Sequence, residues 1–246
     1  MSEADPSVFP DTRWTLVLAL HGHASEATPE QALAYLCGIY WRPLYAFARR
    51  LGNKPQDAED LTQSFLASVV ERHLFKHADE SSGKLRNFLV RSFSNHIYNL
   101  HRVRMAEKRG GAYRFVSMDA IHAFENREMA SVPASATPEA VYEKQCALAV
   151  LEAAMERLRE EEAKAGREPF FDAVRSYVEA CNDEDGSQLD LATRLGLPYG
   201  AVRQSIYRLR IRFRELIRDV VRSTLSRPTD RELADELQSL KLALAQ

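Results

Sequence analysis

The apolar residues of this chain recur at every third or fourth position over long stretches, and this spacing constrains the fold more than any other feature. One series lies between residues 85 and 103, and another lies between residues 202 and 220. Residues at these spacings share one side of a helix, because a helical turn takes 3.6 residues. The members are Leu85, Leu89, Phe93, Ile97, Leu100 and Val103, and then Val202, Ile206, Leu209, Phe213, Leu216 and Val220. Since no stretch alternates as a strand would, we expect an all-α fold.

Prolines and glycines mark where the helices should begin and end. Thr28-Pro29 and Thr137-Pro138 each place a capping residue before a proline at the first helical position, whereas Gly52 and Gly110-Gly111 interrupt the apolar series. Residues 113–137 have no sustained period, which is typical of a flexible linker. We therefore expect an N-terminal extension over 1–29, a first helical domain over 30–112, this linker, a second helical domain over 138–225 and a helical tail over 226–246.

The tail combines two helix signals. Thr229-Asp230-Arg231-Glu232 is a capping box, in which the threonine and the glutamate satisfy backbone N–H groups at the helix start. The apolar residues that follow are spaced by four, three and four positions, namely Leu233, Leu237, Leu240 and Leu244. A helix this short is marginal alone in water, so we expect its leucine seam to pack on the second domain or on a partner.

The distribution of charge indicates anionic partners, although the formal net charge is only −2. Basic residues gather between positions 84 and 114, where Glu107 is the only acid, and between positions 203 and 218, where Glu215 is the only acid. Two basic stretches on a nearly neutral chain predict two local anion-binding faces. The alternative for each stretch is a solvated helix face that binds nothing.

Several classes of protein are disfavoured by what the sequence lacks. Its three cysteines are far apart, which excludes a disulfide framework and fits a reducing compartment. A signal peptide and the run of about 20 apolar residues that spans a membrane are both missing, so we expect a cytoplasmic protein. His73 and His77 could share a metal ion but have no third ligand nearby. Without a phosphate-binding glycine loop or a hydrolase motif, we expect no enzyme, metal or cofactor.

The stretch from residue 182 to residue 225 contains the most informative pattern. We expect an acidic loop at 182–186, a short helix over 189–195, a tight turn at Gly196-Leu197 and a longer helix from Pro198. This is the helix-turn-helix pattern, whose second helix enters the major groove of duplex DNA. Its outer face offers side chains that suit base edges and phosphates, namely Tyr199, Arg203, Gln204, Tyr207, Arg208 and Arg210. The alternative is a helical hairpin with a solvated basic face.

The first basic stretch differs in kind, because aromatic residues are interleaved with its cations and amides. Its members between positions 88 and 104 are Phe88, Arg91, Phe93, Asn95, His96, Tyr98, Asn99, Arg102 and Arg104. Aromatic platforms beside cations bind unstacked bases, so this composition favours single-stranded nucleic acid. Some of these aromatic residues, Phe93 above all, must instead belong to the core.

Three segments of the chain resemble a known family. Asp57-Ala58-Glu59-Asp60-Leu61-Thr62-Gln63 is similar to the polymerase-binding helix of RNA polymerase sigma factors of the extracytoplasmic-function class in the sigma-70 family. Leu85-Arg86-Asn87-Phe88-Leu89, followed by Asn95 and Arg102, resembles the family's −10 and melting helix, and residues 189–218 resemble its −35-reading helix-turn-helix. Phe9-Pro10-Asp11-Thr12-Arg13-Trp14 and Lys108-Arg109-Gly110-Gly111 resemble a branch whose members often occur beside serine/threonine kinases.

The resemblance implies a role for particular residues. A sigma-2-like domain would dock on the coiled coil of the polymerase β′ subunit through Asp57, Glu59, Asp60 and Gln63. The same domain would hold melted −10 DNA through Arg86, Asn95, Asn99, Arg102, Arg104 and Lys108. A sigma-4-like domain would read −35 duplex DNA through Tyr199, Arg203, Gln204, Tyr207, Arg208 and Arg210. An anti-sigma factor or a serine/threonine kinase is a candidate regulator.

The chain departs from the family pattern in two places. Asn99 stands where the family usually has an acid, and the linker carries no family motif. Two other functions remain open. One alternative is a helix-turn-helix regulator that acts without polymerase, although such proteins usually dimerise and only the tail offers a dimer seam. The other is a helical adaptor whose basic faces bind acidic proteins.

Overall fold

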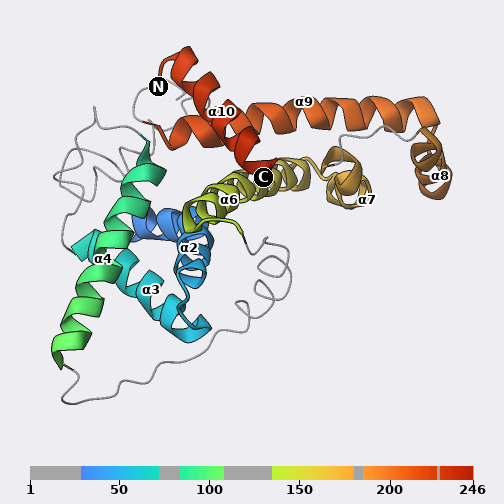
Figure 1. The fold of residues 1–246 in the computed structure, drawn as a ribbon. Helices are drawn as coiled ribbons and strands as arrows, with labels where there is room; N and C mark the ends of the chain where they lie inside the picture. The colour runs from blue at the N-terminus through green and yellow to red at the C-terminus, as the bar shows by residue number, and fades with distance from the viewer. Residues whose placement is uncertain (1–28, 72–83, 108–134, 180–184, 226–227, 246) are drawn as a thin grey trace, which may run out of the picture. The chain divides into compact units, whose positions relative to one another are not determined.

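The computed structural model describes residues 29–71, 84–107, 135–179, 185–225 and 228–245 of the chain. Within those ranges every regular element is a helix, which confirms the all-α fold (Figure 1). Their bounds are α2 (Pro29–Arg50), α3 (Pro55–Glu71), α4 (Leu85–Glu107), α6 (Pro138–Lys164), α7 (Glu168–Glu179), α8 (Asp185–Leu195), α9 (Tyr199–Ser223) and α10 (Asp230–Leu244).

Some sequence-based predictions fall on residues outside these ranges. They concern the N-terminal extension up to residue 28, most of the linker, the histidines His73 and His77, and the motifs at 9–14 and 108–111. Those predictions stay predictions.

The contacts of the chain divide into two units. The first unit comprises Met1–Ala149 together with Arg222–Gln246, and the second comprises Val150–Val221. The division falls inside two continuous helices, since α6 and α9 each contribute residues to both units. The C-terminal helix α10 therefore belongs to the first unit, whereas the sequence led us to expect it on the second domain or on a partner.

Helices α2, α3 and α4 and the first turns of α6 enclose the core of the first unit. Its largest fully buried side chains include Tyr45, Phe65, Phe93 and Tyr142. The ring of Phe93 lies 5.0 Å from that of Phe65 and 6.1 Å from that of Phe47, between centroids. Offset and tilted aromatic pairs at such distances add to the stabilisation that burial provides. Phe93 is thus a core residue, as its helical register predicts.

The expected helix signals are present in the first unit. Gly52 ends α2 with a φ of 92°, a left-handed conformation that glycine adopts without steric cost. The hydroxyl of Thr137 accepts a hydrogen bond from the N–H of Ala140 and so caps α6. Thr229 forms a complete capping box with Glu232 at the start of α10, which confirms that the tail is helical.

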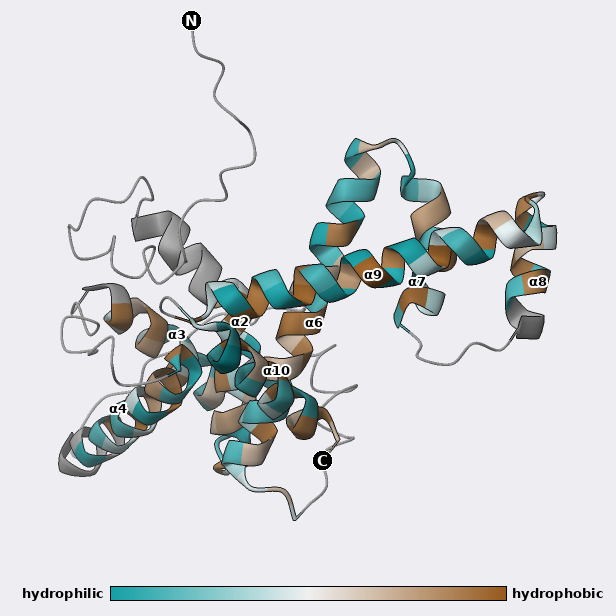
Figure 2. Ribbon diagram, turned by 90° about the horizontal axis from the view of Figure 1, so that it is seen from above, coloured by the Kyte–Doolittle hydropathy of each residue, from teal (hydrophilic) through white to brown (hydrophobic). Residues whose placement is uncertain are grey.

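The second unit contains the helix-turn-helix. Gly196, at φ 65°, ends α8. The N–H groups of Gly196 and Leu197 donate hydrogen bonds to the backbone carbonyls of Thr193 and Ala192, respectively. Helix α9 then buries Val202, Ile206 and Leu209, and Figure 2 shows hydrophobic and hydrophilic residues alternating along its length. Helix α8 begins at Asp185, so the prediction of a loop at 182–186 is wrong for its last two residues.

Candidate polymerase and nucleic-acid interfaces

Helix α4 presents a stripe of polar and aromatic side chains to solvent. Five exposed residues, which we call the α4 stripe, are spaced by four, three, one and three positions: Arg91, Asn95, Tyr98, Asn99 and Arg102. These spacings place them on one side of the helix. Tyr98 is 69% exposed, so its ring is accessible to a ligand. The stripe joins a cation at each end to two amides and an aromatic platform.

The structure brings together only some of the residues that were expected to contact −10 DNA. Asn95, Asn99 and Arg102 lie on the α4 stripe. Arg104 lies in α4 but its side chain is not described, and Lys108 is outside the described residues. Arg91 and Tyr98 belong to the basic, aromatic stretch described from the sequence but were not assigned to −10 DNA there, and they share this face by helical register with Asn95.

Two aromatic residues of this segment, Phe93 and His96, pack against other parts of the protein. Phe93 lies in the core, and His96 is half-buried against α3. The Nε2 atom of His96 lies 3.0 Å from the hydroxyl of Ser64, and its ring centroid lies 5.7 Å from that of Phe65. These contacts hold α4 against α3, while the side chains of the α4 stripe stay exposed to solvent.

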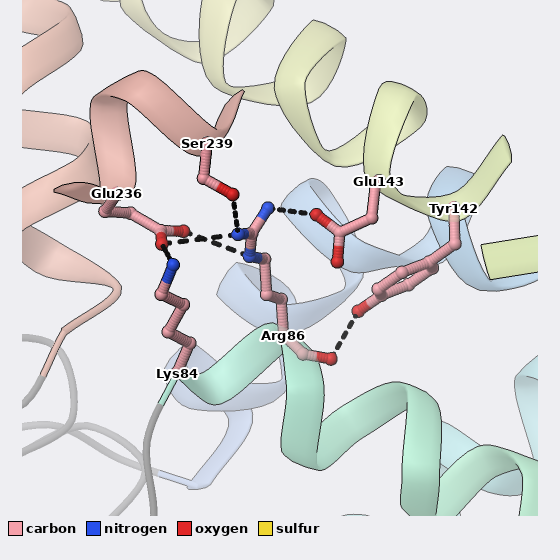
Figure 3. Close-up of polar contacts among 6 residues, drawn as sticks. All are labelled: Lys84, Arg86, Tyr142, Glu143, Glu236 and Ser239. Carbon is pink, nitrogen blue, oxygen red and sulfur yellow. Dashed lines mark hydrogen bonds and ion pairs between the residues drawn. The ribbon is translucent and has the colours of Figure 1, made fainter. Parts of the chain in front are cut away.

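Arg86 does not share the exposure of the stripe. Its side chain is buried, with only 6% of the residue exposed, and it lies among residues of α6 and α10 (Figure 3). It forms ion pairs with Glu143 and Glu236, the latter with 3.0 Å between Nε and Oε1, and donates a 2.9 Å hydrogen bond from Nη2 to Ser239. Lys84 also pairs with Glu236, at 2.5 Å. The expected contact of Arg86 with DNA does not fit this burial.

We call this group the Arg86 cluster: Lys84, Arg86, Tyr142, Glu143, Glu236 and Ser239. The two cations and two carboxylates sum to zero formal charge, so the partly exposed Lys84 and Glu143 balance the buried Glu236 and Arg86. Burial raises the pKa of Glu143, and the neighbouring Glu236 raises it further, against the opposing effect of Arg86. The hydroxyl of Tyr142 donates a 2.9 Å hydrogen bond to the backbone carbonyl of Arg86, and burial raises the pKa of this phenol.

The expected polymerase-docking residues lie near the start of α3 and divide by exposure. Gln63 is exposed, and Asp57 and Asp60 are partly exposed. Glu59 is buried, at 7%, and its Oε1 accepts a 3.2 Å hydrogen bond from Nε2 of Gln63. Glu59 therefore orients Gln63 in this structure and does not itself face solvent.

The residues expected to read duplex DNA lie on the outer face of α9, with one exception. Four of the expected residues are exposed, namely Arg203, Gln204, Tyr207 and Arg208. Tyr199 is partly exposed at the first helical position. Arg210, the exception, donates a 3.0 Å hydrogen bond from Nε to the carbonyl of Tyr177 and so joins α9 to α7.

Two further properties concern the described part of the chain. None of its helices is both long enough and apolar enough to cross a membrane. Its histidine, cysteine and acidic side chains form no group of three that could hold a metal ion.

Comparison with known protein families gives a match over helices α2 to α4. Residues 39–107 match the family model of sigma-70 region 2. The match supports a sigma-70 family RNA polymerase sigma factor. It covers most of α2 and all of α3 and α4, and therefore includes both the start of α3 and the α4 stripe. The sigma-70 family is a family of transcription factors that are not enzymes. No curated protein and no solved structure showed a significant match to the chain.

Proposed function

We propose that this chain is a sigma factor of the extracytoplasmic-function class, which brings core RNA polymerase to specific promoters. The observation that carries the proposal is the match of residues 39–107 to sigma-70 region 2, because it coincides with an exposed stripe suited to unstacked bases. A sigma-70 region 2 implies binding of core polymerase and of promoter DNA. Catalysis in this scheme belongs to the polymerase.

In our proposal the α4 stripe holds the melted −10 strand. Amides such as those of Asn95 and Asn99 can hydrogen-bond base edges that become accessible when a base leaves the stack. Tyr98 offers a ring on which a base can stack, and Arg91 and Arg102 offer charge to the phosphates. Arg104 and Lys108 would extend the basic surface beyond the stripe.

The polymerase would dock on the start of α3. Asp57, Asp60 and Gln63 present acidic and amide groups to solvent there. In this proposal their acidic groups would meet basic side chains of the β′ coiled coil. Glu59 would act from beneath this surface by holding Gln63.

The second unit would read −35 duplex DNA through α9. The exposed Arg203 and Gln204 lie in its first two turns, where a recognition helix reaches base edges. Tyr207 and Arg208 follow in the next turn, and Tyr199 precedes them. Arg210 would support the helix from its contact with α7, in place of a direct role at the DNA.

Location and regulation follow from the proposed function. A sigma factor acts where the polymerase and the chromosome are, so we place this chain in the cytoplasm. An anti-sigma factor or a serine/threonine kinase is the regulatory partner that the family resemblance suggests.

The decisive experiment is reconstitution with core polymerase. Run-off transcription over fragmented genomic DNA should yield discrete start sites with the chain and none without it. Holoenzyme carrying Asn95→Ala should lose these transcripts. If the chain binds specific duplex DNA but gives no transcripts with core polymerase, it is instead a helix-turn-helix regulator that acts without polymerase.

A further inference from the structure

The Arg86 cluster joins three parts of the chain that are far apart in sequence. Arg86 lies 57 residues from Glu143 and 150 residues from Glu236, yet its guanidinium contacts both carboxylates. Figure 3 shows it between α10 on one side and α6 on the other. The first turn of α4 is thus attached to both other helices through one side chain.

The burial of the cluster makes it energetically significant. The side chains of Arg86 and Glu236 are only 7% and 3% exposed. Removing one partner of a buried ion pair leaves the other charge uncompensated, which is far more costly than the loss of a surface pair. The backbone of Arg86 is held as well, since its carbonyl accepts from Tyr142.

One face of helix α10 is buried, and this face includes Glu236 of the Arg86 cluster. Its buried residues are Leu233, Glu236, Leu240 and Ala243, whose spacings of three, four and three define one face. Glu236 is the charged member of that otherwise apolar face. The capping box at Thr229 fixes where the helix starts and hence which residues fall on the face.

The direction of Arg86 separates it from the α4 stripe. Arg86 and Asn95 are nine residues apart, about two and a half helical turns, so they point to opposite sides of α4. A strand of DNA lying on the stripe would therefore meet the far side of the helix from Arg86.

We propose that Arg86 is a positioning residue, and that the C-terminal helix α10 contributes to promoter melting because Glu236 holds Arg86 in place. Glu143 and Glu236 hold Arg86, Arg86 holds the first turn of α4, and α4 presents the stripe to the melted strand. The inference rests on the proposed function, and it assigns a role in promoter opening to a helix that lies outside residues 39–107.

A double-mutant cycle in holoenzyme tests this assignment. Arg86→Met leaves the cluster with one excess carboxylate and Glu236→Met leaves it with one excess cation, so each should lower the melting temperature and reduce promoter opening several-fold. The double variant keeps Lys84 and Glu143, whose charges still cancel, and fills the site with apolar groups. It should therefore recover most of both properties. Asp235→Met, which removes an exposed acid from the same helix, should resemble the parent.

Other outcomes would overturn the inference. If Arg86 contacts DNA, the double variant will regain its melting temperature but open promoters no better than Arg86→Met alone. If α10 instead masks Arg86 from DNA, Glu236→Met will increase promoter opening. Opening is measured by permanganate reactivity of thymines at a temperature where every variant is folded.

A measurement on the unmodified chain guards against variants that fail to fold. Hydrogen exchange of α10 should be equally slow in free holoenzyme and in the open complex, because a positioning contact persists during function. Faster exchange of α10 in the open complex would contradict the proposal. If the parent holoenzyme opens no promoter, the proposed function fails, while the Arg86–Glu236 coupling remains measurable in thermal unfolding.

Discussion

Glu161 and Arg212 form an ion pair with two hydrogen bonds within the second unit. Nε of Arg212 lies 2.9 Å from Oε2 of Glu161, and Nη2 lies 2.8 Å from Oε1. These hydrogen bonds hold the pKa of Glu161 below its ordinary value of 4.5. A carboxyl whose pKa is lowered by folding stabilises the folded state above its unfolded pKa. That contribution disappears as the pH falls through the folded pKa.

We expect Glu161→Gln to flatten the acid side of the stability profile. The variant should lose no more than about 1 kcal/mol at neutral pH, because an exposed pair is screened by solvent. The difference from the parent should shrink as the pH falls below the ordinary carboxyl pKa. Urea unfolding across this pH range measures it, with the exposed neighbour Glu160→Gln as a matched control. Identical profiles for both variants would mean that the pair contributes nothing.

The proposed docking surface on α3 yields a second prediction at the scale of residues. Asp60→Arg reverses a partly exposed charge, so it should weaken binding to core polymerase several-fold while barely changing the free energy of unfolding. Fluorescence titration of labelled chain with core polymerase measures the effect. Glu160→Arg makes the same charge reversal at an exposed position of α6, and this variant should bind core polymerase as the parent does. A folded Asp60→Arg chain with parental affinity would remove Asp60 from the docking surface.

At the scale of helices, local sequence signals predict most of what the structure contains. The boundaries of α6 follow from Thr137-Pro138 and the charged run up to Lys164, and α10 follows from its capping box. The start of α8 is missed because Asp185 and Gly186 resemble a loop, yet they form its first turn. Weak local preferences of this kind are readily overridden by tertiary packing.

The site is predictable only where one helix carries it. The α4 stripe and the outer face of α9 each follow from residues a few positions apart, so helical register reveals them. The Arg86 cluster does not follow from any local pattern, because its carboxylates lie 57 and 150 residues away. The burial of Glu59 could not be predicted either, because the sequence does not show whether a charged residue near the start of a helix is buried.

The capping box allows a test of α10 as an element. Thr229→Ala removes the hydroxyl that accepts from the N–H of Glu232, and the loss of such a cap costs about 1 kcal/mol. We expect faster hydrogen exchange throughout α10, whereas Gln238→Ala at an exposed position should leave exchange unchanged. Unaltered exchange in Thr229→Ala would show that packing alone determines the stability of this helix.

Helix α9 gives the corresponding test for duplex DNA. Arg203→Ala should cost about 1–3 kcal/mol of −35 binding and relax the preference at one base position if the side chain contacts a guanine. Competition between duplexes that differ at single positions measures both effects in holoenzyme. A uniform loss across all sequences would make Arg203 a phosphate contact. Arg222→Ala, exposed at the other end of α9, is the control.

At the scale of the whole molecule, the two units carry different kinds of basic surface. The α4 stripe combines amides and a tyrosine with two arginines, whereas α9 presents arginines beside a glutamine after a tight turn. The former suits bases that have left the stack, and the latter suits the edges of paired bases in a groove. Because each surface lies on a different unit, substitutions should affect duplex binding and strand opening separately.

The separation of these roles is the last prediction. Asn95→Ala and Arg102→Ala should reduce permanganate reactivity of thymines near −10, because extruding a base costs a few kcal/mol that the α4 stripe helps to offset. Binding of −35 duplex by the same holoenzymes should stay unchanged. Arg203→Ala should do the reverse: it should weaken duplex binding and leave unchanged the binding of DNA whose −10 region is already unpaired. Ser94→Ala, a half-buried position of α4 off the stripe, serves as the control. If Asn95→Ala and Arg102→Ala holoenzymes open promoters as well as the parent, strand capture belongs to other residues.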